Sequence, residues 1–229
     1  MNGRTVLITG AKGGLGSFVT QEFLNTGATV VGVSRSIKQS DFPSQNFIAI
    51  EADLASRETV QQIVDSVVEK CGRIDVLAHV VGGFTGGQTV AETDNATWSR
   101  MRDLNLNSAF YVAAAVIPKM RKNRFGRIIS VGSKTADQPH AGLGAYVVFK
   151  AAMVTLFRTI ALENGDAGIT ANIVLPGTMD TPANRAAMPN ADFTQWVPPL
   201  KVAQTIVWLA SDQASHINGA AIPVAGREA

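Results

Sequence analysis

Residues 6–16 read VLITGAKGGLG, a short apolar run that leads into a glycine-rich turn. A helical pattern begins near Leu15. Glycine permits a tight turn and lets backbone amides approach a pyrophosphate, which the N-terminus of the following helix also attracts. The spacing Gly-x-x-x-Gly-x-Gly differs from the simple Gly-x-Gly-x-x-Gly fingerprint, so ordinary loop chemistry is the alternative. The strand before the turn and the helix after it favour a dinucleotide site. Its predicted residues are Gly10, Gly14, Leu15 and Gly16.

Short apolar runs alternate with longer helical patterns along the rest of the chain. The apolar runs predict seven strands, at residues 6–8, 29–33, 47–50, 74–81, 127–131, 170–175 and 220–224. The helical patterns predict helices at residues 15–26, 56–70, 95–122, 144–165 and 199–211, and residues 36–46 form a polar connection. Several strands are continuously apolar, as strands buried on both faces of a parallel sheet are. The order predicts an α/β fold, a doubly wound parallel seven-stranded sheet (Rossmann fold), with residues 1–229 in a single domain.

The composition excludes several classes of function. The chain has 229 residues, 46% of them apolar, and a formal net charge of +2 from 20 basic and 18 acidic residues. This balance argues against a nucleic-acid partner, and the basic cluster at residues 119–127 is expected to close a helix C-terminus. The single cysteine, Cys71, excludes an intrachain disulfide and fits a reducing compartment. No segment resembles a signal peptide or a membrane span, so we expect a cytoplasmic protein. His79, His140 and His216 have no metal-ligand spacing, so no metal site is expected.

The end of the second predicted strand bears on the choice of cofactor. A carboxylate at this point accepts from a ribose 2′-hydroxyl and repels a 2′-phosphate. This chain has Ser34 and Arg35 there, and Arg35 can form forked hydrogen bonds to phosphate; a solvated arginine is the alternative. Lys12, in the glycine turn, adds a second positive charge. NADP(H) is therefore the preferred cofactor, with NAD(H) as the alternative. Asp53 is expected to accept from an adenine amino group or to cap the helix that starts near Ser56.

The segment from Ser133 to Lys150 brings together a hydroxyl, a phenol and an ammonium group. Apolar residues at helical spacing (148, 152, 156 and 160) predict a helix that begins near residue 144. Tyr146 and Lys150 are four residues apart, so we expect them side by side on one helix face. A nearby ammonium favours the phenolate and lowers the tyrosine pKa from its ordinary value of ~10, which makes a general acid or base. A surface pair is the alternative.

Further motifs run from Thr5 to Val224. They are Thr9-Gly-x-x-x-Gly14-x-Gly16, Asp53-Leu54, Asn105-Leu106, Ser133, Tyr146-x-x-x-Lys150, and Asn172-x-x-x-Pro176-Gly177 with Thr181. In order and approximate spacing they resemble the motifs of the short-chain dehydrogenases/reductases, over nearly the whole chain. The resemblance implies an oxidoreductase that transfers hydride between a nicotinamide cofactor and a small carbonyl or alcohol.

The resemblance also implies a role for each matching residue. Tyr146 is the general acid/base, and Ser133 hydrogen-bonds the reacting carbonyl. Lys150 holds the nicotinamide ribose and lowers the tyrosine pKa, and Asn105 holds a water in a proton relay. Further cofactor contacts are expected from Leu54, Gly82, Pro176, Gly177, Thr178 and Thr181, and substrate contacts from Phe84, Lys134, His140, Met188, Phe193 and Trp196. The alternatives are a helix-bend role for Asn105 and a turn or cap role for Thr181.

One motif departs from the family pattern. After the fourth strand the family usually has Asn-Asn-Ala-Gly, which ties the strand to its surroundings, and this chain has His79-Val80-Val81-Gly82. Other residues must therefore supply the hydrogen bonds that the family's asparagines make, and His79 is a candidate to supply one of them. A structural histidine is the favoured interpretation, and a catalytic one is the alternative.

A second, narrower resemblance concerns the substrate. Two loops, at residues 82–87 and 175–196, are similar to those of dihydropteridine reductases, which reduce a quinonoid pterin. That group generally lacks the serine found here as Ser133 and favours NADH, whereas Ser34 and Arg35 favour NADPH. Carbonyl reduction is therefore the main hypothesis and pterin reduction the alternative. A non-catalytic NADP(H)-binding sensor or scaffold is the alternative from another class. The family resemblance also implies a homodimer or homotetramer formed through the long helices.

Residues 183–198 follow the sixth predicted strand and are expected to cover the substrate. In this architecture the chain crosses the nicotinamide end of the cleft at this point. Met188, Phe193 and Trp196 offer apolar surface, and nearby prolines limit the conformations available when the segment opens. We expect a mobile cover that holds substrate selectivity. Permanent packing of the aromatic residues against the core or a partner subunit is the alternative.

Overall fold

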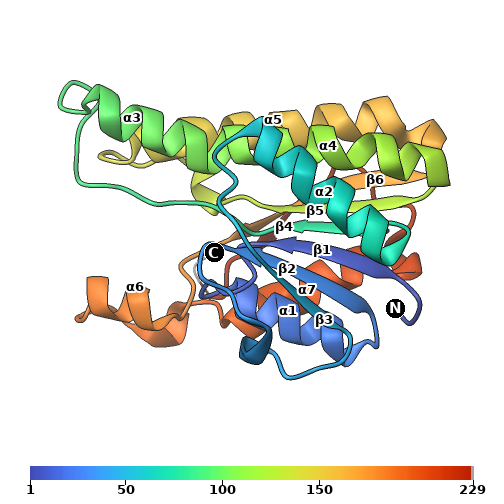
Figure 1. Cartoon of the computed structure of the whole chain (residues 1–229). Coiled ribbons are helices and arrows are strands. Elements are labelled where there is room, and N and C mark those ends of the chain that lie inside the picture. The colour runs from blue at the N-terminus through green and yellow to red at the C-terminus, as the bar shows by residue number, and fades with distance from the viewer. Residues whose placement is uncertain (228–229) are drawn as a thin grey trace.

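Seven parallel strands form the central layer of the protein (Figure 1), which the computed structural model describes over residues 1–227. The strand order is β3-β2-β1-β4-β5-β6-β7, so the direction of winding reverses between β1 and β4. The strands are β1 (Thr5–Thr9), β2 (Thr29–Ser34), β3 (Phe47–Glu51), β4 (Val76–His79), β5 (Gly126–Val131), β6 (Ile169–Pro176) and β7 (Ala221–Val224). Thr9 pairs with Val33 of β2 on one side and with His79 of β4 on the other. The predicted doubly wound fold is confirmed.

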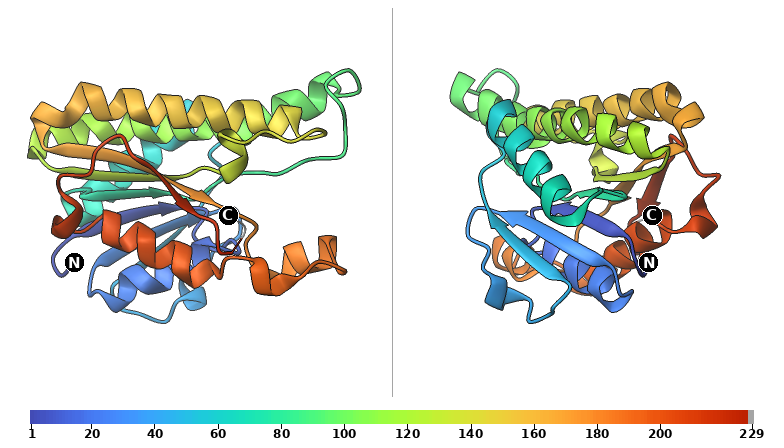
Figure 2. Two further views of the ribbon diagram at one scale, coloured as in Figure 1. Left: turned by 180° about the vertical axis from the view of Figure 1, so that it is seen from behind. Right: turned by 45° about the vertical axis from the view of Figure 1, so that its right-hand side comes forward.

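Helices cover both faces of the sheet. Figures 1 and 2 show α2, α4 and α5 on one face and α1 and α7 on the other. The helices are α1 (Gly16–Asn25), α2 (Arg57–Cys71), α3 (Asn95–Arg102), α4 (Ser108–Asn123), α5 (Gly144–Asn164), α6 (Pro182–Ala187) and α7 (Pro199–Leu209). In both figures α3 and α6 extend past the sheet at the end where the strands finish, one from each helical layer. The site described below lies at this end.

Side chains of the strands alternate between two packed cores. Leu7 and Leu77 are buried on the side of α2, α4 and α5, whereas Ile8 and Ala78 are buried on the side of α1 and α7. Burying such an aliphatic side chain contributes about 1.5–3 kcal/mol. Because helices cover both faces, the strands β1, β4, β5 and β6 are buried throughout, and this explains their continuous apolar runs.

The start of α2 shows how local sequence sets a helix boundary. Ser56 has an extended backbone, and its hydroxyl accepts a hydrogen bond from the Thr59 amide at 3.1 Å. The bond satisfies one of the amides that have no partner in a first helical turn. Ser56 is therefore the cap, and the alternative cap role of Asp53 is wrong.

The helix predicted at residues 95–122 is in fact two helices, α3 and α4, joined by the π-helical segment Asp103–Asn107. A π-helical turn holds one extra residue, so it shifts the register of the side chains that follow. Asn105 lies within this segment, in agreement with its alternative role at a helix bend. Apolar periodicity alone does not reveal the insertion, because both flanking helices bury residues such as Met101 and Val112.

Helix α5 carries two corrections. The predicted apolar stripe is wrong in part, because Val148 is 46% exposed whereas Val147, Val154 and Phe157 are buried. A spacing of four residues drifts by about 40° per step around a helix of 3.6 residues per turn, so such a stripe turns away from the core. In addition, residues 144–167 are long and apolar enough to cross a membrane by length and composition alone. Half of the most apolar window is buried inside the protein, as in a core helix.

Candidate active site

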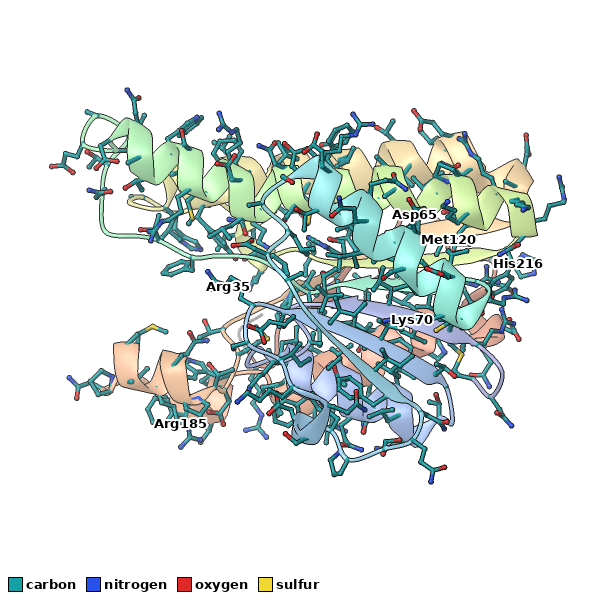
Figure 3. The ribbon with its side chains drawn as sticks, in the orientation of Figure 1. Arg35, Asp65, Lys70, Met120, Arg185 and His216 are labelled. Atoms are coloured by element: carbon teal, nitrogen blue, oxygen red, sulfur yellow. The ribbon has the colours of Figure 1, made fainter. Side chains whose placement is uncertain are left out.

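A cavity of about 650 Å³ opens at the C-terminal ends of β1, β2 and β4, where the strand order reverses. Doubly wound sheets bind their ligands at this switch point. Figure 3 shows Arg35 at this edge, between the two helical layers. The predicted site residues that line the cavity are Gly10, Lys12, Gly14, Leu15, Gly16, Ser34, Arg35, Leu54, Gly82, Phe84, Tyr146, Lys150 and Thr181.

The glycine turn forms one wall of the cavity. The amides of Gly10 and Ala11 donate to the Val33 carbonyl at 2.8 and 3.2 Å, which ties the turn to the end of β2. Helix α1 begins at Gly16, where a Cβ atom would collide with the Gly10 carbonyl. Only glycine lets the helix start so close to the strand. The turn and the N-terminus of α1 thus present backbone amides in the way that suits a pyrophosphate.

Two cationic side chains flank the end of the cavity nearest β2. Arg35 is exposed and lines the cavity together with Ser34 and Ser36. The Lys12 amide donates to Ser34 Oγ at 3.1 Å, and Lys12 Nζ donates to the Ser36 carbonyl at 3.1 Å. A serine stands where a carboxylate would repel phosphate, so this end of the cavity fits a 2′-phosphate.

Tyr146 and Lys150 lie on one face of α5, as predicted. Lys150 Nζ is 5.9 Å from the centre of the Tyr146 ring and donates to the Val131 carbonyl at 2.8 Å. Burial lowers the pKa of Lys150 to about 8, because the interior disfavours its charged form. The exposed Phe84 ring meets the Tyr146 ring edge-on, with centroids 5.1 Å apart. The phenol therefore lies between a buried ammonium and an exposed apolar surface.

The direction of the Tyr146 pKa shift differs from the prediction. Burial raises the pKa of Tyr146, and a hydrogen bond with Ser133 acts in the opposite direction. The predicted net lowering of this pKa is wrong for this structure, because burial of the phenol is the larger effect. The phenol is thus protonated at neutral pH, which is the state a proton donor needs.

Asn105 lies behind the cavity wall and anchors the loop after β4. Its Oδ1 accepts from the Gly83 amide at 3.1 Å, and its Nδ2 donates to the carbonyls of Gly83 and Met101 at 3.0 and 3.1 Å. A Cβ atom on Gly82 would lie 3.0 Å from Lys150 Nζ and 3.1 Å from Asn105 Oδ1. Glycine at position 82 therefore lets the loop pass closely over both side chains. The water-holding role of Asn105 stays a prediction.

His79 links β4 to β1. Its Nδ1 lies 2.9 Å from Thr9 Oγ1, and the Val80 amide donates to the same hydroxyl at 3.2 Å. The side chain is buried, and burial together with the charge of Lys150 lowers the His79 pKa to about 3. A histidine that is neutral at physiological pH and tied to a neighbouring strand fits the structural interpretation.

The remaining predicted residues lie outside the cavity lining. They are Asp53, Ser133, Asn105, Pro176, Gly177, Thr178, Lys134, His140, Met188, Phe193 and Trp196. Trp196 is only 7% exposed, and its ring centroid is 4.7 Å from that of Phe193. The Val197 amide donates to the Thr178 carbonyl at 2.9 Å, which folds the segment back onto the end of β6. This return of the chain, which the sequence pattern did not predict, turns Trp196 inward, in agreement with the packed alternative for that residue.

Several lining residues were not predicted individually as site residues, although Gly13 lies in the glycine turn and residues 183 and 184 lie in the predicted cover. They are Gly13, Val33, Ser36, Ala52, Val80, Val81, Gly83, Leu104, Val131, Gly132, Met179, Ala183 and Asn184. Most are small or apolar, so their types carry no chemical signal. A signal for α6 was present: Thr181 caps this helix by accepting from the Asn184 amide at 3.2 Å, and a proline occupies the first helical position. Thr181 thus lines the cavity and caps a helix.

Among residues 1–227, no group of three or more His, Cys, Asp or Glu is arranged to hold a metal ion.

Together, the doubly wound sheet, the glycine turn and the Ser133, Tyr146 and Lys150 side chains define a dinucleotide-dependent oxidoreductase. The sequence profile described as "short chain dehydrogenase" matches residues 4–192, and the chain belongs to that family.

Relatives are similar over almost their whole length. The chain is 30% identical to the 3-oxoacyl-[acyl-carrier-protein] reductase FabG of Thermotoga maritima, over 99% of this chain and 98% of that protein. It is also 30% identical to the 2,3-dihydro-2,3-dihydroxybenzoate dehydrogenase of Escherichia coli, over 94% of this chain and 93% of that protein.

Solved structures agree with the fold. The structure described as ElxO with NADP bound has a TM-score of 0.92 at 26% identity and covers 99% of this chain and 98% of its own. The 3-ketoacyl-(acyl-carrier-protein) reductase of Brucella melitensis complexed with NADH has the same TM-score and identity and covers 100% and 99%.

Proposed function

We propose that the protein uses NADPH to reduce a small carbonyl compound, or NADP⁺ to oxidise the corresponding alcohol. The observation that carries this proposal is the hydrogen bond between Ser133 and Tyr146, next to Lys150, at a cavity with a cationic end. Residues 1–229 would act as one NADP(H)-binding domain.

Each side chain has a defined task in this reaction. When bound, the cofactor supplies a hydride at its nicotinamide ring. Tyr146 carries a proton on its phenolic oxygen and transfers it to the alkoxide oxygen that develops from the carbonyl. Ser133 donates a hydrogen bond to the same oxygen and so stabilises its charge. Lys150, whose ammonium donates to the Val131 carbonyl, would hold the nicotinamide ribose.

The cationic end of the cavity supports NADP(H) over NAD(H). Among the similar structures, one has NADP bound and another is complexed with NADH, so the family relationship by itself does not select the cofactor. Arg35 and Lys12 lie beside Ser34 at the end of β2, so a 2′-phosphate would meet Arg35 together with Lys12, whose charge Asp41 partly offsets.

The substrate class rests on the catalytic groups and on the apolar residues that line the cavity near them. The two curated relatives, at equal identity, have names that describe different substrates, so similarity does not select one. Phe84, Leu104 and Met179 line the cavity and suit a small carbonyl compound with apolar substituents. Pterin reduction remains the second candidate. It is disfavoured by Ser133, because the resembled reductases generally lack this serine.

Turnover with a substrate panel tests the proposal. Oxidation of NADPH and NADH would be followed with ketones, 3-oxoacyl thioesters and a quinonoid dihydropterin. We expect turnover of a carbonyl substrate with NADPH. Tyr146→Phe, which keeps the ring and removes the proton donor, should lower kcat by about 10²–10⁴-fold with NADPH affinity retained. Lys150→Ala should lower both kcat and the affinity for NADPH. NADPH binding without turnover of any substrate would favour a sensor, and near-normal activity of Tyr146→Phe would exclude the mechanism.

We also propose a cytoplasmic homodimer or homotetramer. Phe110 of α4 and Val148 of α5 are exposed by 41% and 46%, which supports association through these helices. The single cysteine, Cys71, fits the reducing cytoplasm. Analytical ultracentrifugation tests the oligomer, and a monomer at micromolar concentration would contradict it.

A further inference from the structure

Thr135 places a second hydroxyl against the Ser133 hydroxyl. The oxygen atoms Ser133 Oγ and Thr135 Oγ1 are 2.8 Å apart, a normal distance for a hydrogen bond between two hydroxyls. The Thr135 amide also donates to Ser133 Oγ, at 3.3 Å. Ser133 has an extended backbone and caps the short turn Lys134–Ala136, so this local geometry fixes the two hydroxyls next to each other.

The count of protons gives this contact a direction. A serine hydroxyl has one proton to donate and two lone pairs that accept. In the proposed reaction Ser133 donates to the oxygen of the substrate carbonyl. The only Ser133 proton is then directed at that reacting oxygen. Either hydroxyl can be the donor in the 2.8 Å contact; with the Ser133 proton directed at the reacting oxygen, the donor is Thr135, and the order of donation is Thr135 to Ser133 to that oxygen.

We propose that Thr135 is a positioning residue, whose hydroxyl donates to Ser133 Oγ and keeps the Ser133 proton directed at the reacting oxygen. This inference rests on the proposed function. A free serine hydroxyl rotates among several orientations, and in most of them its proton points away from the substrate. A donor at Thr135 occupies one lone pair of Ser133 and removes those orientations. It also polarises the serine O–H bond, because hydrogen bonds in a chain strengthen one another.

The consequence is a preorganised donor at the point where negative charge develops. When a substrate carbonyl lies beside Tyr146, the Ser133 proton is already directed at the substrate oxygen, because the Thr135 hydroxyl fills an acceptor site of Ser133 Oγ. A donor that needs no reorientation stabilises the transition state more than the ground state. Thr135 should therefore affect kcat more than the KM for substrate, and it should leave cofactor binding unchanged.

Matched variants test this role. Thr135→Val keeps the shape and removes the hydroxyl, whereas Thr135→Ser keeps the hydroxyl. We expect Thr135→Val to lower kcat by about tenfold, the loss of roughly one hydrogen bond, and Thr135→Ser to retain most of the wild-type kcat. The apparent pKa that Tyr146 gives to the pH profile of kcat should rise in Thr135→Val, because Ser133 then supports the phenolate less well.

A double-mutant cycle separates positioning from a structural role. In a Ser133→Ala background, Thr135→Val should cause no further loss, because it acts through the serine. Additive losses, equal damage from Thr135→Ser, or wild-type kcat in Thr135→Val would overturn the inference. If Thr135→Val does not fold, Thr135→Ala takes its place in the same cycle, with NADPH binding as the check of folding. If Tyr146→Phe also keeps its activity, the proposed function is wrong. If Tyr146→Phe loses activity but the Thr135 variants keep the wild-type kcat, the proposed function stands and the inference about Thr135 is wrong.

Discussion

Lys12 Nζ lies 2.8 Å from Asp41 Oδ2, so the cation that faces the phosphate end of the cavity already has an anionic partner. The hydrogen bond from Lys12 is the main cause that lowers the pKa of Asp41, followed by the bond from the Lys38 amide. Asp41 is therefore a carboxylate at physiological pH. Asp41 holds the Lys12 side chain in place, and its negative charge also repels a 2′-phosphate that binds beside Lys12.

Replacing Asp41 should improve the binding of NADPH. In Asp41→Asn the amide oxygen can still accept from the Lys38 amide, so the local turn is kept while the negative charge is lost. Because the pair is solvated, we expect a modest gain of about threefold in NADPH affinity, smaller at high salt, and no change for NADH. Titration of both cofactors at two salt concentrations measures this. Weaker NADPH binding would show that Asp41 positions Lys12 rather than competes with the phosphate.

The cofactor preference should reverse when the end of β2 is redesigned. Ser34→Asp with Arg35→Ala removes a cation and adds a carboxylate that repels a 2′-phosphate and accepts from a 2′-hydroxyl. We expect NADPH affinity to fall by at least about tenfold and NADH affinity to rise. The ratio of kcat/KM values for the two cofactors is the measurement. A wild type that binds NADH more tightly than NADPH would contradict the assignment of Arg35.

Ser133→Ala should distinguish the two substrate classes. Carbonyl reduction uses the serine hydroxyl to stabilise the developing alkoxide, so we expect kcat to fall by about 10²-fold or more with a ketone. Reduction of a quinonoid pterin by the resembled enzymes proceeds without a serine, so that activity should survive. Both substrates would be assayed with the same enzyme preparation. Equal turnover of the ketone by the variant and the wild type would remove Ser133 from the mechanism.

His79 should make the protein less stable in acid. Its pKa is about 3 in the folded protein and near 6.5 when exposed, so between these values the unfolded chain binds a proton that the folded chain does not. Stability therefore falls as pH decreases from 6.5 towards 3, by roughly 1.4 kcal/mol per pH unit from this group. When the pH is lowered from 7.5 to 4.5, the free energy of unfolding measured in urea should decrease by about 2–3 kcal/mol less for His79→Asn than for the wild type. His216→Asn, at an exposed histidine, is the control, and an identical pH dependence of His79→Asn and wild type would contradict the prediction.

Residues 183–198 should become protected from hydrogen exchange when NADPH and substrate bind. Arg185 lies over the Phe193 ring at 4.6 Å and pairs with Asp180, so the part of the segment before the buried Trp196 has its own contacts and can move separately from it. Met188 is 42% exposed, and Met188→Ala should change the ratio of kcat/KM values between substrates. Trp196→Ala, at a buried position, should instead lower stability by about 3–5 kcal/mol. Equal exchange in the free and bound protein would mean that the segment is a fixed wall.

The sequence alone determined the architecture and the cofactor end of the site, because these depend on features that are local in the chain. The run before Gly10 and the glycine turn specify a strand and a helix joined tightly, and the spacing of Tyr146 and Lys150 places both on one face of α5. The side chains at the end of β2 could be assigned for the same reason, since the end of a strand fixes their position.

The tertiary structure decided those features of the site that depend on packing between segments far apart in the chain. The direction of the Tyr146 pKa shift follows from burial, which no spacing in the sequence reveals. Lys12 meets Asp41 only because the chain after β2 returns towards the glycine turn. Trp196 is buried because the chain folds back onto the end of β6, and Asn105 reaches Gly83 because a π-helical turn shifts its register. Each of these contacts joins segments whose separation along the chain hides their proximity, so sequence pattern carries no signal for them.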